Sequence, residues 1–185
     1  MADFIRRVPE GDNRERSVCA ECGHIAYENP KVVVGSVVVS DGKVLMCRRA
    51  IDPRRGFWTL PAGYLELGET VEEGARREAL EEASARIALD GVLGLFSISR
   101  IGQVQVIFRA RFDGPPSYAA GEESLDVCLF RPDEIPWADI AFPSVHWALQ
   151  AWARVGQGPL GAPARNPVED LRGAKGLPPG LESGL

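Results

Sequence analysis

The chain has 185 residues and carries 21 Lys and Arg against 26 Asp and Glu, which gives a formal net charge of −5. Hydrophobic residues make up 45% and charged residues 25%, an average globular composition that excludes collagen-like and wholly disordered chains. The acidic balance provides no basic surface for duplex nucleic acid, and no apolar run reaches the about 18 residues of a membrane span. We therefore expect a cytoplasmic protein of one domain with appended segments, without nucleic-acid or membrane partners.

The sequence predicts that residues 1–31 form a short N-terminal arm with little hydrophobic core of its own. The segment is polar and rich in turn residues, and it contains Cys19 and Cys22 in a C-x-x-C pair followed by His24. A closed structural zinc site needs four ligands, and the arm offers at most these three. Zinc binding at Cys19 and Cys22 would therefore need a ligand from elsewhere or from a second subunit, and the alternative is a knuckle with free thiols.

Residues 32–155 are expected to form the main domain. Residues 32–39 form an almost continuous apolar run, which is typical of a strand in the interior of a sheet. Asp41-Gly42 separates this run from a second β-rich run at residues 43–48, and an Asp-Gly pair in that position is a strong signal for a hairpin. A further short strand is expected at residues 57–60.

A helix is predicted from about residue 70 to residue 85. Thr70 is followed three residues later by Glu73, which is the pattern of a capping box. The remaining elements are three strands and a second helix, expected at about residues 87–97, 103–112, 125–130 and 143–155. Strands outnumber helices without strict alternation, so the fold class is α/β in the broad sense (α+β), with a mixed β-sheet sandwiched between helices.

The composition of the C-terminal segment, residues 156–185, indicates no packed structure. From Gly156 onward glycine and proline dominate, and the large apolar residues are scattered without a period. Such a composition is typical of disordered chain, so we expect residues 156–185 to form a disordered tail.

Three carboxylates share one face of the first helix. Glu78, Glu81 and Glu82 stand at positions i, i+3 and i+4, and such a charge run is usually a solvated face. The preceding loop favours a second interpretation, because Gly63 allows its backbone to approach a neighbouring group closely. Mg²⁺ prefers oxygen ligands and is often held by few carboxylates together with substrate phosphates. The pattern thus indicates a cation that joins an acidic protein to an anionic phosphate.

The spacing of these residues resembles the Nudix box, whose usual form is G-x5-E-x7-R-E-U-x-E-E-x-G-U with U apolar. One position departs from it, because Ser84 replaces the usual glycine near the helix end, where we expect changed local geometry rather than lost activity. The resemblance extends over about residues 8–150. Over this range the chain is similar to a subgroup of pyrophosphatases that act on ADP-ribose, FAD and related dinucleotides. The matching polar and glycine positions of the box are Gly63, Glu69, Arg77, Glu78, Glu81 and Glu82.

Members of this subgroup carry an N-terminal zinc-ribbon arm. The pair of Cys19 and Cys22 resembles the second half of that arm, and the first C-x-x-C pair has no counterpart in residues 1–8. Zinc is therefore not expected to bind here as it does in a complete ribbon.

The resemblance implies that the chain hydrolyses the diphosphate bond of a nucleoside diphosphate linked to another moiety, written NDP-X, and releases a nucleoside monophosphate. It implies Mg²⁺ or Mn²⁺ as the cofactor, with Glu78 and Glu82 as metal ligands and Glu81 as a ligand or as the partner of a bound water. The backbone carbonyl of Ala62 would add a further oxygen.

The other candidate residues surround this centre. Glu69 and Arg77 are expected to shape it, since an arginine among several carboxylates can hold one of them by a bidentate pair. The resemblance implies that Glu123 acts as the general base, and Glu81 is the second choice. Residues expected to contact substrate are Arg49, Arg100 and Gln103.

Several alternatives stay open at this stage. A catalytically silent nucleotide-sensing module would keep the fold, but it has no chemical need for the full set of glutamates. If the chain is an enzyme, a nucleotide-pool hydrolase that acts on damaged triphosphates is a further alternative. A zinc-ribbon module for nucleic acid is opposed by the incomplete cysteine set and the acidic charge. The resemblance also implies a homodimer as one arrangement of the chain.

Overall fold

The computed structural model describes residues 3–167 of the chain. Contacts divide the chain into two units with the boundary between Pro30 and Lys31, one residue from the boundary expected from the sequence. Within the described residues, no helix is both long and apolar enough to cross a membrane.

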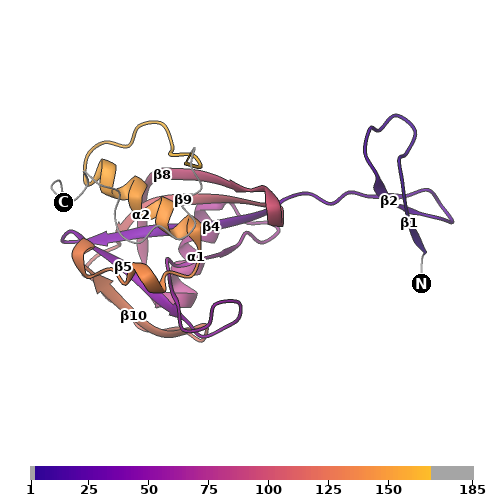
Figure 1. Ribbon diagram of the computed structural model, residues 1–185. Helices are drawn as coiled ribbons and strands as arrows, with labels where there is room; N and C mark the ends of the chain where they lie inside the picture. Colours follow the sequence, from indigo (N-terminus) through magenta and orange to yellow (C-terminus); the bar gives the residue numbers. More distant parts are fainter. Residues whose placement is uncertain (1–2, 168–185) are drawn as a thin grey trace. The chain divides into compact units, whose positions relative to one another are not determined.

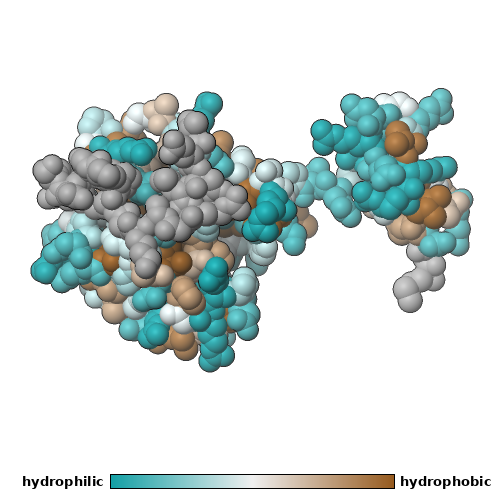
Figure 2. All heavy atoms as spheres, in the orientation of Figure 1, coloured by the Kyte–Doolittle hydropathy of each residue, from teal (hydrophilic) through white to brown (hydrophobic). Residues whose placement is uncertain are grey.

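The N-terminal unit is a small antiparallel sheet. Its described residues contain β1 (Phe4–Arg7), β2 (Arg16–Cys19) and β3 (Ile25–Ala26), in the order β1-β2-β3. Among those residues only Val18 and Cys19 are buried, and Figure 2 shows hydrophobic atoms at the surface of this unit. So small a sheet has little apolar surface to bury, as the turn-rich sequence predicts.

The second unit is built around a large mixed sheet (Figure 1). The path β10-β5-β4-β9-β8 contains one parallel pair, β4 with β9, and its other pairs are antiparallel. Two short strands are added beside it, because β6 pairs with β5 and β7 with β4. The strands described for this unit are β4 (Lys31–Ser40), β5 (Lys43–Arg49), β6 (Trp58–Thr59), β7 (Ala62–Tyr64), β8 (Ile87–Ile98), β9 (Gln103–Phe112) and β10 (Ser124–Phe130).

The hairpin predicted between the first two of these strands is confirmed. Val39 of β4 pairs with Val44 of β5, so that the connection is the Asp41-Gly42 pair. Asp41 has φ 49° and Gly42 has φ 72°, and a two-residue hairpin with both central residues at positive φ matches the right-handed twist of its strands.

Two α-helices cover the opposite faces of the sheet in the described part of this unit, α1 (Val71–Ala83) and α2 (Pro143–Val155). Successive residues of β4 enter different hydrophobic clusters, because side chains alternate along a strand. Val37 packs in the cluster that contains Leu149 of α2, whereas Val38 packs in the cluster that contains Ala79 of α1. The predicted sheet between helices is therefore confirmed. Three short 3-10 helices complete the elements: η1 (Ser99–Ile101), η2 (Pro132–Glu134) and η3 (Trp137–Asp139).

Both ends of α1 follow from the sequence. Thr70 and Glu73 form the reciprocal capping box, so the predicted helix start is confirmed. The helix ends at Ser84, which has φ 50° and donates its backbone N–H to the carbonyl of Leu80. Serine thus takes the left-handed position that glycine adopts most easily at a helix end, and the termination is kept.

The segment after α2 is ordered for its described length. Ala164 forms a parallel bridge with Gly94 at the free edge of β8, and Leu160 packs against the core. The predicted disorder is therefore wrong for residues 156–167, while residues 168–185 lie outside the described residues. The error has a physical reason: the segment is held largely through backbone groups at a sheet edge, which leave no periodic pattern of side chains.

Arg109 of β9 fixes the beginning of this segment. Its Nη1 donates to the carbonyl oxygens of Gly156 (3.0 Å) and Gly158 (2.6 Å), and its Nε donates to Asp90 (3.0 Å). The side chain is only 12% exposed, so these bonds are partly shielded from water.

We predict that Arg109→Ala lowers the free energy of unfolding by about 2 kcal/mol, because three acceptors lose a charged donor. The control is Arg111→Ala, whose side chain is 64% exposed and lies 3.7 Å from Asp90. For this control we expect a change below about 0.5 kcal/mol. Urea unfolding of both variants measures the difference, and equal losses of stability would contradict the role given to Arg109.

Candidate functional site

A close approach of β7 to α1 creates the site. Gly63 pairs with Val34 of β4, and a Cβ atom at Gly63 would overlap the carboxylate of Glu78. Gly35 of β4 lies equally close to Ala62, where an added Cβ would overlap the Ala62 side chain. Glycine is required at both positions because the backbone and the carboxylate occupy the space of a side chain.

Glu78 and Glu82 lie on the inner face of α1 and are only 8% and 6% exposed. The Oε2 atom of Glu82 accepts a hydrogen bond from the backbone N–H of Ala62 at 3.0 Å. Burial raises the pKa of Glu82 to about 8, and it raises the pKa of Glu78 as well. The negative charge of Glu78 also raises the pKa of Glu82, so the two carboxylates are ionised together most easily beside a cation.

Arg77 connects the carboxylates of the loop and the helix. It forms a bidentate pair with Glu69 (3.0 and 2.8 Å) and donates to Glu78 (2.7 Å) and Glu81 (3.0 Å). Its Nη2 also donates to the backbone carbonyl of Tyr64 at 3.0 Å. The hydrogen bonds from Arg77 lower the pKa of Glu69 to about 2, so this carboxylate stays ionised. The structure thus brings together the residues expected to shape the site.

Glu123 lies in the loop that precedes β10, and this loop is attached to the C-terminal end of α1. The N–H of Gly121 donates to the carbonyl of Glu82 at 3.1 Å, and the carbonyl of Glu123 accepts from Ala50 at 2.7 Å. The negative charge of Glu123 contributes to the raised pKa values of Glu78 and Glu82, which places the three carboxylates in one electrostatic neighbourhood. Glu81 is more open, with a side chain that is 58% exposed.

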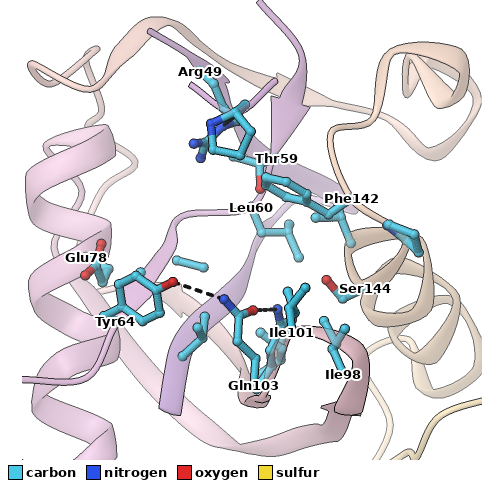
Figure 3. Close-up of a pocket in the computed structure, with 18 of the residues that line it drawn as sticks. Arg49, Thr59, Leu60, Tyr64, Glu78, Ile98, Ile101, Gln103, Phe142 and Ser144 are labelled. Atoms are coloured by element: carbon cyan, nitrogen blue, oxygen red, sulfur yellow. Dashed lines mark hydrogen bonds between the residues drawn. The ribbon is translucent and has the colours of Figure 1, made fainter. Parts of the chain in front are cut away.

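These carboxylates line one side of a cavity of about 1220 Å³. Figure 3 shows Glu78 on α1 at one side, Phe142 and Ser144 at the opposite side, and Gln103 between them. Tyr64 accepts a hydrogen bond from Gln103 through its hydroxyl at 3.1 Å. The sequence-predicted residues that line the cavity are Arg49, Ala62, Arg77, Glu78, Glu81, Glu82, Arg100, Gln103 and Glu123, and Glu69 reaches it through Arg77.

Sequence reasoning missed part of the cavity wall. Tyr64 stands inside the motif and could have been found from its position after Gly63, whereas Phe142, Trp147 and Asn166 carry no motif signal. Arg49 was expected near phosphate, and its guanidinium lies 5.2 Å from the ring centroid of Phe142. An arginine over an aromatic face is held by a cation–π contact while its edge stays available for hydrogen bonds.

The residues present fit a hard divalent cation. Carboxylate oxygens are the ligands that Mg²⁺ prefers, and Glu78 and Glu82 supply them at a buried position where negative charge needs compensation. Within residues 3–167, no three side chains of His, Cys, Asp or Glu lie close enough to hold an ion together. Mg²⁺ usually takes one or two carboxylates together with waters and substrate phosphates, and a pair of buried carboxylates matches that mode.

The cysteine pair of the N-terminal unit forms a knuckle-like turn. The N–H of Cys19 donates to the carbonyl of His24 at 2.8 Å, and the N–H of Gly23 donates back to the carbonyl of Cys19 at 3.0 Å. Hydrogen bonds from the backbone of Cys22 and Glu21 lower the pKa of the Cys19 thiol. Both thiols are free, and the fourth ligand that zinc would need is not supplied by the described part of this arm.

Comparisons with known proteins agree with this geometry. The family model for the NUDIX domain matches residues 29–150, and a model for the Nudix N-terminal region, a zinc-ribbon family, matches residues 3–28. A crystal structure of a NUDIX hydrolase from Nitrosomonas europaea is 43% identical, covers 89% of this chain and 94% of its own, and superposes with a TM-score of 0.82.

Two relatives add a shorter similarity. A MutT-like protein from Streptomyces ambofaciens is 39% identical over 103 residues, which are 56% of this chain and 64% of the relative. An ADP-ribose pyrophosphatase from Methanocaldococcus jannaschii is 38% identical over 71 residues, which are 38% of this chain and 42% of the relative. The chain thus matches less than two thirds of the length of either relative. From the match over residues 29–150 and the similarity to the Nitrosomonas structure, we conclude that the chain belongs to the Nudix hydrolase family.

Proposed function

We propose that this protein hydrolyses the diphosphate bond of an NDP-X substrate, of which ADP-ribose and FAD are the leading examples, in the presence of Mg²⁺ or Mn²⁺. The observation that carries the proposal is the pair of buried carboxylates, Glu78 and Glu82, at one side of a cavity of about 1220 Å³. A buried carboxylate pair suits a divalent ion, and a divalent ion suits a diphosphate.

The size of the cavity supports a substrate with two large parts. Pockets for small ligands commonly measure about 300–1,000 Å³, so a cavity of about 1220 Å³ has room for more than a mononucleotide. One of the relatives is named an ADP-ribose pyrophosphatase, and ADP-ribose is a substrate with two large parts. The size of the cavity therefore favours a dinucleotide-like substrate over a nucleoside triphosphate.

The chain's own residues have separable roles in the proposed reaction. A bound divalent ion supplies charge neutralisation at the diphosphate and acidifies water. Glu82 is oriented by the N–H of Ala62, and Arg77 orients the carboxylate of Glu78. Glu123, on a loop fixed to the end of α1, accepts the proton of the attacking water.

The polar wall of the cavity binds the substrate in this proposal. Arg49 and Arg100 offer guanidinium groups that fit phosphate oxygens. Gln103 is held by Tyr64, so its amide is oriented before a substrate arrives. A homodimer and a cytoplasmic location stay predictions.

We predict that Glu82→Gln abolishes metal-dependent release of AMP from ADP-ribose while leaving the fold intact. An amide is a weaker metal ligand than a carboxylate, so kcat should fall by at least about 10²-fold. The assay is release of the nucleoside monophosphate, which is AMP from ADP-ribose, FAD, NADH and ADP-glucose and the damaged monophosphate from a damaged purine triphosphate, with Mg²⁺ and with EDTA.

The matched control for this variant is Glu72→Gln, an exposed residue of the same helix that should retain full activity. Hydrolysis by Glu82→Gln at near the wild-type rate would contradict the site. Tight binding of ADP-ribose by the wild type without release of AMP would instead favour a nucleotide sensor, and turnover of the triphosphate alone would favour a pool hydrolase.

The assignment of the general base generates a second prediction. Glu123→Gln should lower kcat by about 10²-fold with little change in KM, because a base acts in the transition state and not in binding. The neighbouring Glu122, which also lines the cavity, provides the control, and Glu122→Gln should change kcat less than threefold. If Glu81→Gln shows the large effect and Glu123→Gln does not, the base is Glu81.

A further inference from the structure

The segment after α2 ends at the wall of the cavity. Ala164 accepts a hydrogen bond from the N–H of Leu95 (2.8 Å) and donates to the carbonyl of Leu93 (2.9 Å), so it extends the edge of β8. Asn166 and Pro167 then line the cavity. The segment therefore reaches the cavity from outside residues 29–150, the range that the family model matches.

Asn166 makes two hydrogen bonds with a single backbone position. Its Oδ1 accepts from the N–H of Ser97 at 2.8 Å, and its Nδ2 donates to the carbonyl of Ser97 at 2.7 Å. Ser97 stands opposite Val104 of β9, and its one N–H and its one C=O point away from β9 toward the edge of the sheet, where they bond to Asn166. A side-chain amide offers a donor and an acceptor side by side, and here it replaces the backbone of a neighbouring strand.

Ser97 is the first residue of the part of the cavity wall that Asn166 can influence. Ser97 and Ile98 end β8, and η1 (Ser99–Ile101) follows directly, and all of these residues line the cavity. We call residues 97–101 the rim. Because Asn166 lies 69 residues away in sequence, the bond to Ser97 is a long-range constraint on the rim.

The chemistry of the rim differs from that of the carboxylate side. Ile98 and Ile101 offer apolar surface, and Ile101 is 48% exposed. Figure 3 shows both isoleucines to the right of Gln103, on the side away from Glu78. Trp147 of α2 lines the same cavity and adds an aromatic surface. The rim joins these apolar surfaces to the polar Ser99 and Arg100, and a nucleobase, which is apolar on its faces and polar at its edge, is suited to that combination.

We propose that Asn166 is a positioning residue that fixes the rim, and that the rim receives the nucleobase of the substrate. The proposal rests on the proposed function, since it concerns the nucleoside part of the NDP-X substrate, next to the phosphate proposed for Arg100 of the same rim. It gives the segment after α2 a part in substrate recognition, although this segment contains none of the family's motif.

The test compares Asn166→Ala with Arg165→Ala, an exposed neighbour whose side chain does not line the cavity. Loss of two hydrogen bonds to the rim should raise the KM for ADP-ribose about tenfold and leave kcat within twofold. The same factor is expected for FAD and ADP-glucose, because the adenine is common to all three. Asn166→Asp keeps the acceptor for the Ser97 N–H but sets a second carboxylate oxygen against the Ser97 carbonyl in place of the donor, so its KM should rise at least as much as that of Asn166→Ala.

The outcomes separate this inference from the proposed function. An unchanged KM in Asn166→Ala overturns the positioning role, and a fall in kcat at constant KM does so too. A KM that rises for one substrate only shows that the rim contacts X and overturns the assignment to the base. Arg165→Ala should match the wild type, and thermal unfolding of each variant reveals a general loss of structure.

Calorimetric titration of ADP-ribose in EDTA measures the same contact without turnover. If the wild type binds ADP-ribose but hydrolyses no substrate, the proposed function fails, and a tenfold weaker Kd for Asn166→Ala still supports the inference. If Asn166→Ala binds as tightly as the wild type, the inference fails, whatever the activity.

Discussion

The approach of two carboxylates on α1 to the backbone of β7 is the constraint on which the site depends. Glu78 fills the space that a side chain at residue 63 would occupy, and Glu82 accepts a hydrogen bond from the backbone of Ala62. Both carboxylates must come from one helix face, so the helix has to begin at a fixed residue. The capping box at Thr70 determines that start, and a shift of one residue would rotate the face by about 100°.

Burial of negative charge opposes folding, and the surrounding structure compensates for it. Arg77 supplies one positive group that is shared among Glu69, Glu78 and Glu81, so these three carboxylates are paired within the protein. Glu82 accepts a hydrogen bond from the N–H of Ala62 and feels the charge of Arg49, yet burial still raises its pKa to about 8. The inner end of the site is therefore the part with the largest electrostatic demand for a cation. An acidic protein can hold an anionic diphosphate there because the interaction is local and does not depend on net charge.

Local signals in the sequence predicted local structure well. The Asp41-Gly42 hairpin and the start of α1 follow from dipeptide and tetrapeptide chemistry, and the carboxylate spacing follows from the helix period. The order of the strands and the ordered segment at residues 156–167 did not follow. Backbone pairing at the edge of β8 involves groups that every residue carries, so glycine-rich and proline-rich chain can be ordered there without a readable pattern.

The two ends of the cavity have different origins in the chain, and this difference has a consequence for specificity. At the carboxylate end, Glu78 and Glu82 come from one contiguous stretch, residues 62–82, whose geometry tolerates little change because backbone and carboxylate are in contact. The opposite end combines β8, α2 and Asn166, which meet only in the fold. Substitutions at that end can alter which moiety is accepted without moving the carboxylates. Sequence motifs therefore identify the reaction of such a chain more readily than its substrate, since the substrate contacts that we propose at Arg49, Arg100 and Gln103 lie outside the motif.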